Sequence, residues 1–419
     1  MVIKLDKSSP ASLRRTHRGL VLSKIQGYPG ISRAELARAL GFSDMAATRI
    51  IREFIDAGLV EEMEFAQDGV ARKKKSLGRP KIGLRICGDG LFAAGIIVSA
   101  YHSEVSISDA NGRLRASKRI GYFVSDNIAE TARHYGRALA ALVRESGIDA
   151  ERLVGAGIAL AARTSLENGE IVSSDYFGWG PDRGVFRREI QKIIGQPIEI
   201  DNVSNALSIA EMRFGAARGA SDFVLIHVAT VIGAAVLSGK RLIRGQGGIS
   251  GMIGHFRTEA TPFRCVCGRS DCLNLSATGF GILSRLGKTH GPSFDRTKLE
   301  DYAASLLKVV EDPGNGPIIA QAGRCLAPVI DNICKLLGPE MIILSGQLGT
   351  NEHYIAGLRT EIAAAFKGDR TSHVPVIAGS ISPTLAAPHM ALHAFCYSDR
   401  LDFGRFAKDA GSDTASERS

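Results

Sequence analysis

The chain has 419 residues, enough for two or three domains, and its 45% hydrophobic content allows a substantial buried core. No apolar run reaches the length of a membrane span, and the N-terminus does not resemble a signal peptide, so we expect a cytoplasmic protein without a membrane partner. The net charge of +9 is unevenly placed: residues 1–81 contain 16 Lys and Arg against 9 Asp and Glu, a net charge of +7. A basic head on a nearly neutral body favours a polyanion as its partner.

Residues 11–26 predict a first helix, and two short helices are predicted between residues 31 and 60. Ser32 and Glu35 form a capping box at the start of the first of these two, and Gly41 supplies its left-handed end. The second has apolar residues at i, i+3, i+4 and i+7, which are Ala47, Ile50, Ile51 and Phe54. This pattern predicts a helix-turn-helix whose second helix enters the major groove of DNA; the alternative is an ordinary helical hairpin in a larger core.

The outer face of the second helix is polar and basic, as expected for a surface that contacts DNA. Arg49 and Arg52 are the strongest candidates for base or phosphate contacts, and neighbouring side chains lie within reach of base edges. The candidate DNA-binding residues on this helix are Ser43, Asp44, Met45, Thr48, Arg49 and Arg52.

The next residues predict the wing of a winged helix: a strand at 59–65, a turn at 67–69 and a return strand directly afterwards. A basic segment with a Gly-Arg-Pro sequence then follows at residues 71–83, and we expect it to be a linker. Such a charged run can be a solvated linker only, or it can bind DNA as well. In the second case Lys73, Lys74 and Lys75 would contact phosphates, and Arg79 would enter an adjacent minor groove.

From residue 84 the chain has the pattern of an α/β protein with two lobes and a cleft between them. We expect strands at 92–98, 105–108, 153–159, 197–201 and 341–345, a strand pair at 223–237, and helices at 128–146, 205–214, 323–337 and 354–366. The predicted domains are a winged helix-turn-helix at 1–70, the linker at 71–83, a first lobe at 84–203, a second lobe at 204–380, a C-terminal helix returning to the first lobe at 381–403, and a disordered tail at 404–419.

Three of the seven cysteines lie close together in one stretch, Cys265, Cys267 and Cys272, ten residues after His255. Three thiolates and one imidazole make a closed four-coordinate set suited to a structural Zn²⁺ ion. An odd cysteine count in a reducing compartment argues against a disulfide framework. Separate core cysteines with a hydrogen-bonded histidine are the alternative.

Several motifs together resemble the ROK family of bacterial sugar kinases and sugar-responsive repressors. They are the winged helix with Gly78-Arg79-Pro80, Asp201-Asn202 followed by Glu211 and Phe214-Gly215-Ala216, Gly254-His255, the cysteine cluster, and the segment 338–346. The first is similar to the repressor branch, which includes N-acetylglucosamine and xylose repressors. The resemblance implies a winged helix-turn-helix on a two-lobed, actin-like ATPase body similar to ROK sugar kinases, with zinc bound by the same four ligands.

The chain departs from the kinase pattern of the family at three places. The acidic position and Gly-Gly-Thr turn near the first strand correspond to Ile97 and Ser99-Ala100-Tyr101. The second phosphate loop reads Ala-Thr-Val-Ile-Gly-Ala at residues 229–234, and the position of the catalytic aspartate is Val203. Without phosphate loops or a base, phosphoryl transfer lacks its positioning and its proton acceptor, so we expect no enzyme activity.

The sugar-binding positions of the family are only partly kept. Two glutamates that hold sugar hydroxyls correspond to Met252 and Asn274, whereas Asn202 and His255 remain, and these four are the candidate effector residues. The effector could therefore differ from a glucose-type sugar, bind weakly, or have been lost. Trp179 could stack on a sugar ring or belong to the core.

Together these features predict a transcription regulator, a repressor of carbohydrate uptake or catabolism genes, that binds double-stranded operator DNA as a homodimer or tetramer. A sugar or sugar phosphate would control it. The alternatives are a carbohydrate kinase with an accessory DNA-binding head, and a DNA-binding protein whose effector site has decayed.

Overall fold

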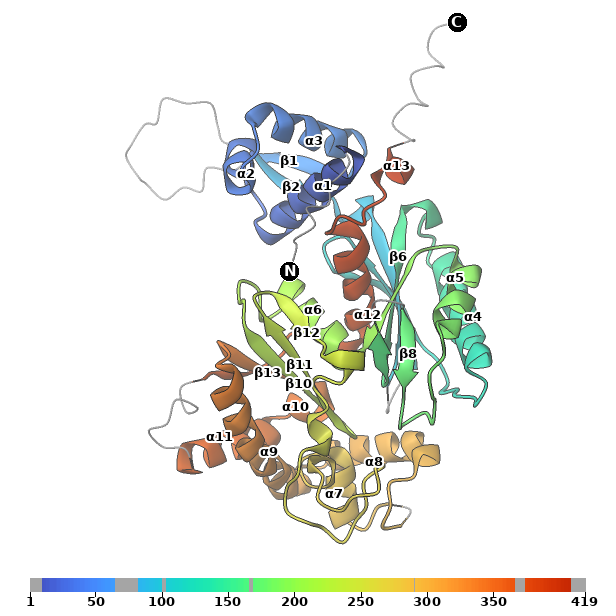
Figure 1. Ribbon diagram of the computed structural model, residues 1–419, viewed down its shortest axis with the longest axis vertical. Coiled ribbons are helices and arrows are strands. Elements are labelled where there is room, and N and C mark those ends of the chain that lie inside the picture. Colours follow the sequence, from blue (N-terminus) through green and yellow to red (C-terminus); the bar gives the residue numbers. More distant parts are fainter. Residues whose placement is uncertain are drawn as a thin grey trace, which may run out of the picture.

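A computed structural model describes residues 10–64, 82–99, 103–165, 169–289, 291–365 and 374–407. It places a small N-terminal domain, here termed the head, at one end of a two-lobed body (Figure 1). No helix in these ranges combines the length and apolar character needed to cross a membrane.

Within residues 10–64 and 82–86, the head contains three helices and a two-stranded antiparallel sheet. Its elements are α1 (Pro10–Gly27), α2 (Arg33–Leu40), α3 (Asp44–Asp56), β1 (Val60–Glu64) and β2 (Ile82–Ile86). The capping box of Ser32 and Glu35 begins α2, and Gly41 ends it with φ of 67°, as predicted. The four apolar residues predicted to face inward on α3 are buried, and Ile31 forms a bridge to Leu84 beside the wing strands. The head is therefore a winged helix.

The wing differs from the prediction in its second strand. The return strand expected directly after residue 69 was wrong: β1 pairs with β2, and Val60 lies opposite Ile86. Residues 82–86, assigned to the linker and first lobe, therefore belong to the head, where Leu84 is fully buried. The basic segment thus connects the two wing strands instead of leaving the domain. Lys73, Lys74, Lys75 and Arg79 themselves lie outside the described residues.

The body contains two five-stranded sheets with the same topology. The strand orders are β5-β4-β3-β6-β9 and β12-β11-β10-β13-β14; in each, the first three strands are antiparallel and the last two run parallel to the third. The first sheet consists of β3 (Phe92–Val98), β4 (Ser103–Asp109), β5 (Leu114–Arg119), β6 (Leu153–Leu160) and β9 (Ile198–Asn202). The second consists of β10 (Phe223–Val228), β11 (Ile232–Ser238), β12 (Arg241–Ile243), β13 (Met341–Ser345) and β14 (Val376–Ala378). This repeated topology is the expected two-lobed, actin-like architecture.

Helices cover both sheets (Figure 1). The carboxyl ends of β3, β6, β9 and β10 line a cavity between the lobes. The first lobe carries α4 (Ile128–Glu145), α5 (Val185–Ile194) and the small hairpin of β7 (Arg163–Ser165) and β8 (Glu170–Ser173). The second carries α7 (Gly279–Arg285), α8 (Leu299–Glu311), α9 (Gly316–Leu337), α10 (Gly346–Gly349) and α11 (Glu352–Ala365). Between the two sheets lies α6 (Val203–Phe214), which packs on α12 (Pro383–Ala391).

The C-terminal segment joins the body to the head. Helix α12 packs on the first sheet so closely that a Cβ at Gly157 would lie 2.0 Å from the Ala387 carbonyl oxygen. A π-helix at Leu392–Cys396 and α13 (Phe403–Phe406) follow, and Phe403 and Phe406 are buried in a hydrophobic core shared with the head. The disordered tail expected from residue 404 is therefore wrong for residues 404–406, and residues 408–419 lie outside the described ranges.

Candidate DNA-binding face, central cavity and metal centre

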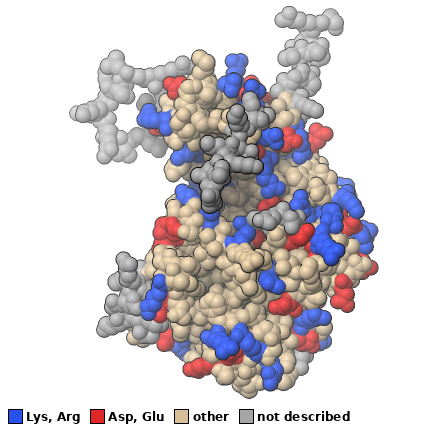
Figure 2. Space-filling view, in the orientation of Figure 1, with Lys and Arg blue, Asp and Glu red and all other residues tan. Residues whose placement is uncertain are grey.

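The outer face of α3 is exposed and directed away from the body (Figure 1). Five predicted DNA contacts lie on it, all exposed: Asp44, Met45, Thr48, Arg49 and Arg52. Met45 is 84% exposed, and Arg49 has no ion pair with a described residue. Ser43 is the N-cap, and its Oγ accepts a hydrogen bond of 3.2 Å from the Ala46 amide. On the face seen in Figure 2, basic side chains reach the outer end of the head.

The orientation of α3 is fixed from its buried side. The Arg18 guanidinium on α1 forms an ion pair of 2.7 Å with Glu53 on α3 and lies 4.3 Å from the ring centroid of Phe403. The Arg18 side chain is half-buried at this junction. The head is therefore held by the C-terminal segment as well as by its own core.

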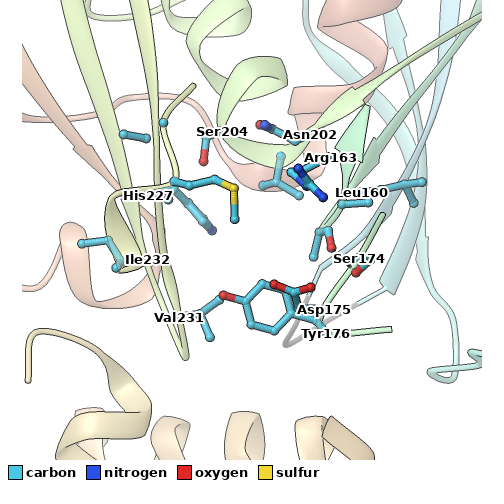
Figure 3. A pocket seen from close by; sticks show the side chains of 18 of the residues that line it. Leu160, Arg163, Ser174, Asp175, Tyr176, Asn202, Ser204, His227, Val231 and Ile232 are labelled. Carbon is cyan, nitrogen blue, oxygen red and sulfur yellow. Dashed lines mark hydrogen bonds between the residues drawn. The ribbon is translucent and has the colours of Figure 1, made fainter. Parts of the chain in front are cut away.

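A cavity of about 130 Å³ lies between the lobes, at the carboxyl ends of β3, β6 and β9 (Figure 3). Three of the four predicted effector residues line it: Asn202, Met252 and His255. Asn274 does not; it is 4% exposed, and its Oδ1 accepts a hydrogen bond of 3.2 Å from the Ile232 amide. The Asn274 side chain is therefore directed at the backbone of Ile232 and not into the cavity.

The structure also shows where Ile97 and Trp179 lie relative to this cavity. Ile97, which the resemblance places at the acidic position near the first strand, is buried in the core with Val203 and does not line the cavity, whereas Val203 does. Trp179 is 4% exposed, packs against Phe177, and its Nε1 donates a hydrogen bond of 3.0 Å to the Ser125 carbonyl. Trp179 therefore belongs to the core and is not a stacking platform in this cavity.

In the segment 229–234, where the resemblance places the second phosphate loop, three backbone amides are already engaged. The Ala229 amide donates to the Val231 carbonyl at 3.0 Å, and the Ala234 amide to the Gly251 carbonyl at 2.8 Å. The Ile232 amide is the donor to Asn274. A phosphate cradle needs free amides that converge on the anion. These three amides cannot serve in this way.

Asp201 is a buried carboxylate next to the cavity that the sequence did not single out for a structural role. Its Oδ2 accepts a hydrogen bond of 2.8 Å from Arg244, and its Oδ1 accepts bonds from Asn205 at 2.7 Å and Thr164 at 3.1 Å. Because Arg244 follows β12, this ion pair links the two lobes. Asp201 thus joins the two lobes beside the cavity, and both of its carboxylate oxygens already accept hydrogen bonds.

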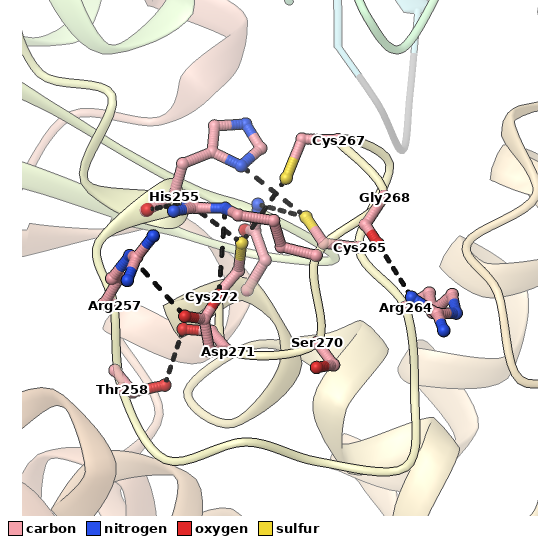
Figure 4. A network of polar contacts seen from close by, with 12 residues as sticks. His255, Arg257, Thr258, Arg264, Cys265, Cys267, Gly268, Ser270, Asp271 and Cys272 are labelled. Carbon is pink, nitrogen blue, oxygen red and sulfur yellow. Dashed lines mark hydrogen bonds and ion pairs between the residues drawn. The ribbon is translucent and has the colours of Figure 1, made fainter.

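The four predicted metal ligands come together in one loop region (Figure 4). Their ligand atoms all lie within 4.8 Å of one another. His255 Nδ1 is 3.6 Å from Cys265 Sγ, and Cys267 Sγ is 3.5 Å from Cys272 Sγ. Tetrahedral zinc with Zn–S bonds of about 2.3 Å separates its sulfur ligands by about 3.8 Å. The donor set and its spacing therefore fit a four-coordinate zinc ion.

The surroundings of these ligands also suit a bound cation. Burial raises the pKa of the Cys265 thiol and raises that of Cys272 to about 12, so the thiolate forms need a stabilising positive charge. Arg269 donates hydrogen bonds to the His255 carbonyl and, at 3.3 Å, to Cys272 Sγ. The sequence prediction missed Arg269, although a basic residue inside a cysteine loop is the signal for such an outer-sphere donor.

Comparison with known proteins gives two family matches. A model described as the ROK family matches residues 93–385, and one described as winged helix-turn-helix DNA-binding matches residues 15–61. The DNA-binding transcriptional dual regulator NagC of Escherichia coli K12 is 22% identical over 394 residues, 91% of this chain and 92% of its own length.

Solved structures show the same fold. A crystal structure of a ROK family transcriptional regulator, a homologue of the E. coli Mlc protein, has a TM-score of 0.72 and 21% identity, covering 95% of this chain and all of its own. A ROK family glucokinase from Streptomyces griseus, solved with glucose and AMPPNP, has a TM-score of 0.58 and 20% identity, covering 72% of this chain and 98% of its own. The first likeness includes the head; the second matches a smaller share of the chain.

Proposed function

Because the chain belongs to the ROK family and carries a winged helix at its N-terminus, we propose that it is a DNA-binding transcription regulator, a repressor of genes for carbohydrate uptake or catabolism. The observation that carries this proposal is the exposed polar and basic face of α3. This face lies at the outer end of the head, which is joined to a body with the ROK fold. The relative NagC, named as a transcriptional regulator, supports the class of function.

In this proposal the heads of a homodimer, or of a tetramer, read DNA half-sites separated by whole helical turns. Arg49 and Arg52 contact bases or phosphates, while Asp44, Met45 and Thr48 reach base edges. The wing segment adds phosphate contacts through Lys73, Lys74 and Lys75, and Arg79 enters the minor groove.

Helix α6 gives a physical route from the cavity to the head. At its start, the Asn202 side chain caps the helix beside the cavity and accepts a hydrogen bond of 2.8 Å from the Asn205 amide. At its end, Arg213 donates a hydrogen bond of 3.1 Å to Ser23 on α1, and its carbonyl accepts one of 3.3 Å from Gln26. A ligand that shifts the first turn of α6 would therefore displace α1, and operator affinity would change if the two positions differ in DNA contacts.

We also propose that the protein is not a kinase and that its metal is a structural zinc ion. The apolar side chain of Val203 lines the cavity where the family resemblance expects the catalytic base, and amides of the phosphate loop are engaged. Zinc held by His255, Cys265, Cys267 and Cys272 would fasten the loop behind the cavity, with no open position for catalysis. Phosphorylation of a hexose by purified protein and ATP would contradict this part.

The function can be tested by selecting duplexes from a random library with the full-length protein. We expect enrichment of a two-fold symmetric sequence, and we expect Arg49→Ala with Arg52→Ala to weaken binding to it at least about tenfold. The matched control is Arg144→Ala, which removes an exposed arginine from α4 in the body and should leave binding unchanged. Failure to enrich any sequence would contradict the proposal.

A further inference from the structure

We propose that the cavity between the lobes binds an anionic sugar derivative whose carboxylate or phosphate group pairs with Arg163. This inference rests on the proposed function, because it names the chemical class of the effector. Neither the cavity nor Arg163 enters the argument that the protein binds DNA.

Arg163 lies at the start of β7 and is the one arginine among the described residues that line the cavity. Its Nε donates a hydrogen bond of 2.9 Å to Ser173 Oγ on β8. Within the described ranges, its guanidinium makes no other hydrogen bond and no ion pair. Figure 3 shows the guanidinium inside the cavity, near Asn202 and Leu160. Its two terminal nitrogens are therefore free to meet a ligand.

Partial burial among apolar side chains makes an unpaired Arg163 guanidinium energetically unfavourable. Arg163 is half-buried, and Leu160, Val203 and Met252 line the same cavity with apolar side chains. A charge that loses water without gaining a partner destabilises the fold, whereas a bound anion restores the lost interaction. A guanidinium also matches carboxylate and phosphate oxygens with two parallel hydrogen bonds. The bond to Ser173 fixes the guanidinium before a ligand arrives, which lowers the entropy cost of binding.

The scarcity of carboxylates in the lining argues against a neutral sugar. Asp175 is the single carboxylate among the described lining residues, and it is exposed. Val203 and Met252 occupy positions where the family resemblance expects acids that accept hydrogen bonds from sugar hydroxyls. Asp175 lies beside Tyr176 (Figure 3), and His255 lines the same cavity. That end of the cavity can therefore hold hydroxyl groups, while the Arg163 end holds the anion.

Such a ligand would also contact both lobes. Arg163 belongs to the first lobe, whereas His227, Met252 and His255 belong to the second. Since His255 Nδ1 faces Cys265, its Nε2 is the nitrogen left for a hydroxyl of the ligand. A sugar acid or sugar phosphate held at both ends would favour the closed cleft.

The test measures ligand binding by calorimetry and thermal shift on full-length, zinc-loaded protein. The probes are D-gluconate and D-glucuronate for a carboxylate, D-glucose 6-phosphate for a phosphate ester, and D-glucose as the neutral sugar. We expect at least one anionic probe to bind and raise the melting temperature, with D-glucose much weaker. Comparing the carboxylate probes with the phosphate ester shows which anionic group the cavity binds. Preference for D-glucose, or no binding by any anionic probe, would overturn the proposal.

The variants locate the effect at Arg163. We expect Arg163→Gln to weaken binding of the anionic probe about 10- to 100-fold. Arg163→Lys keeps the positive charge but not the paired donors of the planar guanidinium, and should weaken binding less. Arg144→Gln on the body surface is the control for charge loss and should bind as the wild type. Equal affinity of Arg163→Gln and wild type would overturn the inference. Zinc content and binding to the selected duplex show whether each variant is folded.

The same preparations separate this inference from the proposed function. Sequence-specific DNA binding without selectivity for anions would overturn the anionic effector alone. Anion binding that depends on Arg163, without any specific DNA binding, would contradict the regulator and leave the anion site standing.

Discussion

At the scale of single residues, the sequence predicted those roles that depend on neighbours in the chain. Ser32, Glu35 and Gly41 act on their own neighbours in the chain, so the caps of α2 were predictable. The cysteine spacing was likewise a local signal for a cluster that the structure brings together. Asn274 was assigned to the cavity by resemblance, but its side chain turns to Ile232. Such orientations depend on tertiary packing, which no local pattern contains.

The metal centre gives a prediction at this scale. Cys272→Ser should lower the zinc content from one ion per subunit to nearly none, because Cys272 is a buried member of the four-ligand set. The loss should also lower the melting temperature by more than about 5 °C, since metal binding contributes to folding. Cys325→Ser, at a half-buried cysteine outside the cluster, is the matched control for elemental analysis. Retention of one zinc ion by Cys272→Ser would show that the ligand set is wrong.

A buried histidine predicts how stability depends on pH. Burial lowers the pKa of His389 to about 4, while its Nε2 lies 2.8 Å from the Gly112 carbonyl oxygen. The unfolded chain takes up this proton near pH 6.5, so the folded state loses stability as pH falls from 6.5 towards 4. The expected loss through this group is about 2 kcal/mol between pH 7 and pH 5. Urea unfolding of wild type and His389→Gln at both pH values checks this, and equal pH dependence would count against it.

At the scale of elements, sequence periodicity located most helices and strands but not their partners. The predicted strands at 153–159 and 341–345 became β6 and β13, because continuous apolar runs suit central strands buried on both faces. The wing was misassigned because pairing joins β1 to a strand beyond a long connection. The alternation of Ile82, Leu84 and Ile86 was a signal for a half-buried strand that the prediction gave to the wrong domain.

Helix α6 carries a prediction about coupling between body and head. Arg213 is half-buried at the end of α6, where it donates a hydrogen bond to Ser23 and lies 4.8 Å from the ring centroid of Tyr397. Arg213→Met should keep the apolar stem but remove the polar link, so amide hydrogen exchange should rise in α1 more than in α3. Arg137→Met, at an exposed position on α4, controls for the loss of charge. Unchanged exchange in α1 would mean that α6 does not hold the head.

At the scale of the whole molecule, head and body share one hydrophobic core. Phe54 of the head packs on Phe403 with ring centroids 5.4 Å apart, and Leu401 and Phe406 lie in the same core. The packing of α13 on the head was not predictable from the sequence. The residues beyond 407 are polar and small, and the prediction extended the disordered tail from them back to residue 404. The head is therefore packed against the C-terminal segment of the body.

The shared core predicts cooperative unfolding of head and body. Calorimetry of the wild type should show the head unfolding together with the first lobe. Phe403→Ala should cost about 3 kcal/mol and let the head unfold separately at a lower temperature, because it leaves a cavity in the shared core. Arg405→Ala, next to Phe406 on the same short helix but not in that core, is the control. A separate head transition already in the wild type would contradict this view.

The account as a whole depends on specific recognition of DNA by the α3 face. The most direct measurement is the ratio of dissociation constants for the selected duplex and a scrambled duplex of the same composition, at about 0.15 M salt and with zinc present. The account predicts that the full-length protein binds the selected duplex at least about 1,000-fold more tightly. A ratio close to one would contradict it.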